Sequence, residues 1–255
     1  MHRHAIRDED WDRLENLLPG REDLPGVTAK DNRLFIDAVL WIAKTGAPWR
    51  DLPERFGNWN SVWRRFDRWA RKGIWEKVFE QLKDPDLEWL MLDSTVVRAH
   101  ACAAGAKKGA DGTGGQEDQA LGRSRGGFGT KIHIATDGLG NPVRFSLTAG
   151  QVGDLTQAES LLEGLAPGAV IADKGYDSDK FVAKVGSIGA EVVIPPLGCR
   201  KVLREYDEHI YKERNKVERF IGLIKQFRRV ATRYEKTARN FLAFVHVASI
   251  MVLLR

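Results

Sequence analysis

The chain has 255 residues, of which 43% are hydrophobic and 29% charged, and this is the balance of an ordinary globular protein. Its formal charge is +5, and its cysteines, Cys102 and Cys199, lie far apart without a metal-site spacing. These features argue against a disulfide framework or a zinc site and fit a reducing cytoplasm. No signal-peptide pattern opens the chain, and its apolar end is too short to span a bilayer comfortably. We therefore expect no membrane association.

Three main helices are expected in the first part of the chain. Apolar spacing predicts the first at residues 10–18, Asp31 can cap the second, and Asn58 can cap a third with an aromatic face. Helix, short helix and basic helix is the arrangement of a helix-turn-helix, so residues 1–84 are expected to form a small all-α domain that binds DNA or joins protomers. The arginines on the outer face of the third helix are equally compatible with a role in solubility alone. The candidate DNA contacts on the third helix are Arg64, Arg65 and Arg68.

A second domain is expected over residues 85–255, after the breaker Asp84-Pro85-Asp86. Its first strand is apolar and β-branched but is interrupted by Asp93. A carboxylate in a buried strand costs several kcal/mol unless it is paired or binds a metal. Asp93 is therefore either a strand-end residue satisfied by the hydroxyls of Ser94 and Thr95, or a ligand.

The segment 101–129 is rich in glycine and too irregular for a regular element. We expect a flexible loop whose Arg123 and Arg125 settle on a DNA phosphate, or else a plain surface loop. Two strands joined by a DGLGNP turn follow, and then a helix capped by Asp154. The next strand ends at Asp173. This succession of hairpin-linked strands and then alternating helices and strands predicts a mixed sheet covered by helices.

Residues 211–225 are predicted to form an amphipathic helix. At about 100° per residue, Tyr211, Arg214, Glu218 and Lys225 fall within roughly 60° of one another, away from the apolar stripe. An Arg and a Glu four residues apart are common on solvated helix faces. From Tyr211 to Arg239, however, ten lysines and arginines stand against three glutamates, which favours a surface for a polyanion.

The spacing of these four residues resembles the signature helix of bacterial insertion-sequence transposases of the DDE type. The upstream segments LDSTVVRAH, GRSRGG, TKIH and ADKGYDS are similar to the catalytic blocks of insertion-sequence family five. The glycine-rich spacer before GRSRGG is longer than the family pattern. The resemblance implies a ribonuclease H-like α/β fold in which Asp93, Asp173 and Glu218 bind metal. It also implies that Tyr211, Arg214 and Lys225 lie against DNA.

The function implied is that of a bacterial DNA transposase that binds the terminal inverted repeats of its element, hydrolyses the ends and joins the 3′ hydroxyl to target DNA. Two Mg²⁺ ions, replaceable by Mn²⁺, suit three carboxylates and such a reaction. We expect a homodimer in the synaptic complex, acting on double-stranded DNA in the cytoplasm and at the nucleoid. A structure-selective nuclease of the same fold and an inert DNA-binding regulator are the alternatives.

Overall fold

The computed structural model describes residues 4–26, 28–106, 117–124 and 126–255. The chain divides into two compact units, one formed by residues 1–82 with 224–255 and the other by residues 83–223. The sequence-based division placed 224–255 in the second domain, whereas in the structure these residues pack with the N-terminal helices. Within the described ranges, no helix combines the length and apolar character needed to cross a membrane.

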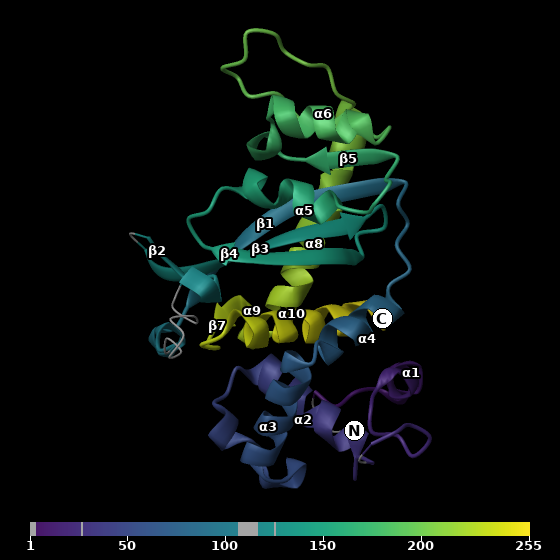
Figure 1. Cartoon of the computed structure of the whole chain (residues 1–255), viewed down its shortest axis with the longest axis vertical. Helices are drawn as coiled ribbons and strands as arrows, with labels where there is room; N and C mark the ends of the chain where they lie inside the picture. Colours follow the sequence, from purple (N-terminus) through teal and green to yellow (C-terminus); the bar gives the residue numbers. More distant parts are fainter. Residues whose placement is uncertain (1–3, 27, 107–116, 125) are drawn as a thin grey trace. The chain divides into compact units, whose positions relative to one another are not determined.

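The first unit is helical, and its predicted caps are confirmed. Asp31 accepts a hydrogen bond from the Leu34 N–H (2.8 Å), and Asn58 accepts from the Asn60 and Ser61 N–H groups. The short helix expected between the second and third helices is a pair of 3₁₀ turns. The elements are α1 (Asp8–Leu14), η1 (Glu15–Leu17), α2 (Asn32–Thr45), η2 (Trp49–Asp51), η3 (Glu54–Phe56), α3 (Trp59–Arg71), α4 (Ile74–Leu82), α9 (Arg228–Ala231), β7 (Thr232–Arg233) and α10 (Ala238–Leu253) (Figure 1).

The apolar helix α10 supplies much of the core of this unit. The Phe244 ring stacks on Phe66 at 4.5 Å between centroids, and the His246 ring stacks on Phe79 at 5.3 Å. A buried carboxylate, Asp67 of α3, accepts a hydrogen bond from the side-chain amide of Asn240 (3.0 Å). The first and last segments of the chain therefore share one core.

The second unit is built on a mixed sheet in which β4, β3, β1, β5 and β6 are neighbours in that order. The first three strands are antiparallel, β5 runs parallel to β1, and β6 runs parallel to β5. The expected hairpin and strands are thus confirmed. The strands are β1 (Trp89–Ala99), β2 (Gly122–Ser124), β3 (Gly127–Asp137), β4 (Pro142–Ala149), β5 (Ala169–Ala172) and β6 (Glu191–Val193).

The helical segments of this unit connect the strands and lead to the C-terminal part of the chain. They are η4 (Ala101–Ala104), η5 (Glu117–Gln119), η6 (Asp154–Gln157), α5 (Ala158–Leu162), η7 (Lys174–Tyr176), α6 (Asp179–Ser187), α7 (Glu208–Tyr211), η8 (Lys212–Arg214) and α8 (Asn215–Lys225). Part of the expected flexible loop is therefore ordered, since β2 pairs with the start of β3. Residues 107–116 and Arg125 lie outside the described residues.

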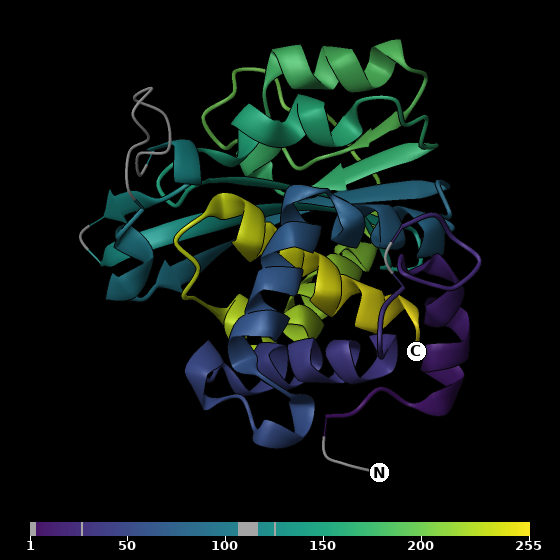
Figure 2. The same cartoon turned by 60° about the horizontal axis from the view of Figure 1, so that its bottom comes forward.

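The two faces of the sheet are covered by different helices. On one face, Leu92 of β1 and Ala172 of β5 pack with α5 and α6, the green helices beside the sheet in Figure 2. On the other, Asp93, Ile134 and Phe145 stand side by side on β1, β3 and β4. The Phe145 ring stacks on Phe220 of α8 at 6.0 Å between centroids. Asp93 therefore belongs to the face that α8 covers.

Two local expectations were wrong. Asp154 does not cap a helix: it is the first residue of η6, and its carboxylate accepts hydrogen bonds from Ser94 and Lys131 instead. The single helix expected over residues 211–225 is divided into α7, η8 and α8. At the division, the Asn215 side chain donates a hydrogen bond to the Lys212 carbonyl (2.6 Å), and such local bonds compete with regular helix.

Candidate active site

Two of the predicted carboxylates follow the last residue pair of two neighbouring parallel strands. Leu92 of β1 and Ala172 of β5 form the last pair in the register of these strands. Asp93 is the next residue of β1, and Asp173 is the residue that follows β5, so pairing brings the two aspartates together. Asp173 follows the end of its strand as expected, whereas Asp93 lies inside β1, which continues to Ala99.

The turn after β5 fixes the carboxylate of Asp173. Asp173 caps η7 by accepting a hydrogen bond from the Gly175 N–H (2.8 Å). A Cβ atom added to Gly175 would lie 2.9 Å from Asp173 Oδ1, closer than real contacts of this kind. The glycine therefore allows the backbone to approach this carboxylate closely.

The third carboxylate, that of Glu218, is linked to Asp93 by hydrogen bonds from one arginine. Arg214 of η8 donates from one terminal nitrogen to Asp93 Oδ2 (2.9 Å) and from the other to Glu218 Oε1 (2.5 Å). The side chains of Asp93 and Arg214 are 13% and 17% exposed, whereas that of Glu218 is 58% exposed. Arg214 was expected to contact DNA, and here its guanidinium is the cation between two carboxylates.

The charges of the cluster act on one another. Burial raises the pKa of Asp93, the Arg214 guanidinium and the Ser94 N–H oppose this rise, and the charges of Asp173 and Glu218 add to it. The ionised form of Asp93 is therefore costly without a cation beside it. The same charges act on Tyr211: burial raises its pKa, and the negative charges of Asp173 and Glu218 add to this rise.

Carboxylate oxygens are the donors that hard divalent cations prefer, so Asp93, Asp173 and Glu218 fit such an ion by type. With Arg214 between Asp93 and Glu218, no three acidic, His or Cys side chains of the described part are grouped to hold one. In the present arrangement the guanidinium thus offsets part of the negative charge of the cluster. A cation shared by all three carboxylates requires Arg214 to move aside.

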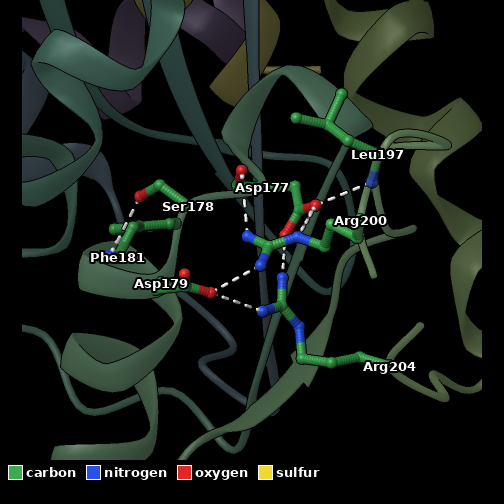
Figure 3. Close-up of polar contacts among 7 residues, drawn as sticks. All are labelled: Asp177, Ser178, Asp179, Phe181, Leu197, Arg200 and Arg204. Carbon is green, nitrogen blue, oxygen red and sulfur yellow. Dashed lines mark hydrogen bonds and ion pairs between the residues drawn. The ribbon is translucent and has the colours of Figure 1, made fainter. Parts of the chain in front are cut away.

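A second polar cluster, which the sequence did not reveal, anchors the segment leading to α7. The buried carboxylate of Asp177 accepts hydrogen bonds from the Leu197 N–H (2.7 Å) and from Arg200 Nε (2.5 Å), and it pairs with Arg204 (Figure 3). Arg200 also bonds Asp179 at 2.6 Å. The turn after Asp173 is thereby tied to the connection that precedes Arg214 and Glu218.

The other predicted DNA contacts are scattered over the chain. Tyr211 ends α7 and packs edge-on against Tyr206 at 5.6 Å, Lys225 ends α8, and Arg123 is an exposed residue of β2. Arg125 lies outside the described residues. These roles stay predictions.

On α3, Arg64 and Arg68 are exposed, but Arg65 is held within the helical unit. Its guanidinium lies 4.2 Å from the Phe35 ring centroid and 4.8 Å from that of Trp69, and burial lowers its pKa to about 10. Arg65 also donates to the Asn32 side chain. Of these three arginines, Arg64 and Arg68 therefore have the freer guanidinium groups.

Both parts of the chain match known protein families. Residues 84–253 match the model of the family described as "Transposase DDE domain". The chain belongs to the DDE transposase family. Residues 6–79 of this transposase match a second family model, described as "Putative transposase of IS4/5 family". The resemblance found in the sequence is thereby confirmed, and the chain is a DNA transposase.

The transposase has similar relatives in bacteria. It is 45% identical over 109 residues to the uncharacterized protein y4sN of Sinorhizobium fredii, covering 42% of this chain and 87% of that protein. It is 42% identical over 130 residues to a putative transposase for insertion sequence element IS6501 of Brucella ovis, covering 49% of this chain and 98% of that protein.

A solved structure supports the fold of the transposase. The cryo-EM structure of a piggyBac transposase synaptic complex with hairpin DNA matches with a TM-score of 0.53 and 10% sequence identity, over 98% of this chain and 72% of that one. Together with the mixed sheet and its covering helices, this match identifies the ribonuclease H-like fold. A divalent metal cofactor follows from membership of the DDE family.

Proposed function

We propose that this transposase binds the terminal inverted repeats of an insertion sequence, cleaves the ends by hydrolysis and joins the resulting 3′ hydroxyl to target DNA. The observation that carries the proposal is that Asp93 and Asp173 directly follow the last residue pair of the adjacent strands β1 and β5, with Asp93 on the face covered by α8, the helix that bears Glu218. Asp93, Asp173 and Glu218 are assigned as the side chains that hold two Mg²⁺ ions, which Mn²⁺ can replace. When bound, such ions activate the attacking oxygen and stabilise the departing one.

Arg214 has two successive partners in this proposal. Without DNA it pairs with Asp93 and Glu218, which explains how the largely buried carboxylate of Asp93 is tolerated there. A guanidinium also binds phosphate oxygens well, because its planar fork donates two parallel hydrogen bonds. Arg214 therefore exchanges the carboxylates for a DNA phosphate when metal and substrate enter.

The remaining DNA surface is assigned to cations on both units. Lys225 and Arg123, with Arg125, are assigned to backbone phosphates, and Tyr211 to a nucleotide near the cut. In the helical unit, Arg68 lines a hollow of about 590 Å³ together with Lys72, and we assign this surface to the inverted repeats. The transposase is proposed to act as a homodimer in the bacterial cytoplasm, because two ends must be held together.

The test uses cleavage and strand transfer with purified protein, Mg²⁺ and DNA carrying an inverted repeat. Asp93→Asn, Asp173→Asn and Glu218→Gln are each expected to lower both rates at least a hundredfold while DNA binding persists. Glu159→Gln is the matched control, since Glu159 is an exposed carboxylate on α5 whose partner is Lys180. Cleavage without joining of a pre-cut end would identify a nuclease. Excision unaffected by Glu218→Gln would identify a regulator.

A further inference from the structure

The strand that carries Asp93 loses its pairing with β5 just before this residue. Beyond Leu92, β1 has no register partner on β5, whereas its register with β3 continues to Arg98. Ser94 follows Asp93 on the strand and therefore points to the opposite face of the sheet, where it stands beside His133 of β3. The orientation of the peptide between Asp93 and Ser94 thus depends on the pairing with β3 and on the groups that Ser94 binds.

Ser94 donates two hydrogen bonds, each to a different carboxylate. Its backbone N–H donates to Asp93 Oδ1 (2.8 Å), and its hydroxyl donates to Asp154 Oδ1 (2.6 Å). One residue therefore connects the carboxylate on the α8 side of the sheet with a second carboxylate on the reverse side. Asp154 is absent from the set of predicted site residues.

Asp154 is a strong acceptor at this position. The Lys131 ammonium donates to the same Oδ1 atom at 2.8 Å, and its side chain is only 12% exposed. Burial opposes ionisation of Asp154, but the hydrogen bonds from Lys131 and Ser94 outweigh it and lower the pKa. Hydrogen bonds to an ionised acceptor are about twice as strong as neutral ones. The ion pair of Lys131 and Asp154 thus holds the Ser94 hydroxyl on the face of the sheet opposite Asp93.

We propose that Asp154 is a positioning residue for the metal site: together with Lys131 it holds the Ser94 hydroxyl, and through the Ser94 N–H it sets the orientation of the Asp93 carboxylate. This inference rests on the proposed metal-binding role of Asp93. Groups that hydrogen-bond a ligating carboxylate typically change metal affinity or activity by about 10- to 100-fold when they are removed.

The chain contains a matched control for this inference. Ser146, on β4 and also opposite His133, donates its hydroxyl to Gln157 Oε1 at 2.6 Å. Ser94 and Ser146 therefore both tie the sheet to η6 by hydrogen bonds of equal length. Of these two serines, Ser94 is the one that is hydrogen-bonded to Asp93. A purely structural role of Ser94 would make the two serines equivalent.

The experiment measures Mn²⁺ affinity by calorimetry on the full chain without DNA, with melting temperature and the kcat and KM of end cleavage measured beside it. Ser94→Ala and Asp154→Asn are expected to weaken Mn²⁺ binding and lower kcat by about 10- to 100-fold, with KM for DNA little changed. Ser94→Thr, which keeps the hydroxyl, and Ser146→Ala are expected to stay within about threefold of the parent.

Equal effects of Ser94→Ala and Ser146→Ala, or loss of melting temperature without loss of Mn²⁺ affinity, would overturn the inference. Asp93→Asn separates it from the proposed function. If Asp93→Asn leaves Mn²⁺ affinity unchanged, the metal site itself is wrongly assigned. If Asp93→Asn removes binding while Ser94→Ala and Asp154→Asn do not weaken it, only the positioning role fails.

Discussion

Arg214 shows how one cation can offset part of the charge of neighbouring carboxylates. We predict that Arg214→Gln raises the Mn²⁺ affinity of the DNA-free protein several-fold, because it removes a cation that competes for Asp93 and Glu218. The same change should slow DNA cleavage. Calorimetry and a cleavage assay measure the two effects, and the control is Arg219→Gln, which changes an exposed arginine of the following helix α8. Weaker Mn²⁺ binding by the variant would show that Arg214 organises the site instead.

The buried His133 makes stability depend on pH. Its ring bonds the Thr148 hydroxyl at 2.8 Å, and burial lowers its pKa from 6.5 to about 4. The folded state thus keeps the ring neutral while the unfolded chain binds a proton, so this contribution is complete above pH 6.5 and is lost as pH falls toward 4.

His133→Gln is accordingly expected to reduce the loss of unfolding free energy between pH 7 and pH 4 by about 2 to 3 kcal/mol. Urea titrations of both proteins across this range measure the difference. Because the acidic groups are shared by the two proteins, their contribution largely cancels. Parallel pH profiles would mean that His133 is protonated in the folded state.

At the scale of elements, the cluster around Asp177 joins the turn after β5 to the connection before α7. Asp177→Asn should lower the unfolding free energy by about 3 kcal/mol. The reason is that it removes the buried negative charge with which Arg200 and Arg204 are paired. Asp179→Asn is the control, since Asp179 binds the same arginines from an exposed position and should cost about 1 kcal/mol or less. Equal costs for the two variants would contradict this account.

The parts of the fold that the sequence predicted correctly depend on short-range patterns. Asp31 and Asn58 were identified as caps, and Asp173 as a strand end, because the residues that determine these features are neighbours along the chain. The hydrogen bonds that Ser94 donates to Asp154 and Arg214 donates to Asp93 join residues 60 and 121 positions apart. Such pairs are set by strand register and helix placement, which local periodicity does not encode.

At the scale of the whole molecule, the helical unit is assembled from both ends of the chain. We predict that residues 1–82 produced alone have lower helicity and a less cooperative thermal transition than a fusion of residues 1–82 to 224–255 through a flexible linker. The reason is that α10 supplies Phe244 and His246 to the core. Circular dichroism during heating measures the difference. A sharp transition of the shorter fragment would show that its helices need no such partner.

This assembly has a consequence for the order of events during synthesis. Helix α10 (Ala238–Leu253) is the last element of these 255 residues to leave the ribosome. The helices that begin the chain must therefore wait, with their aromatic side chains uncovered, while all of residues 83–223 are translated. A nascent chain cannot complete its helical unit before residues 83–223 have been made, so a prematurely terminated product would lack a finished helical unit.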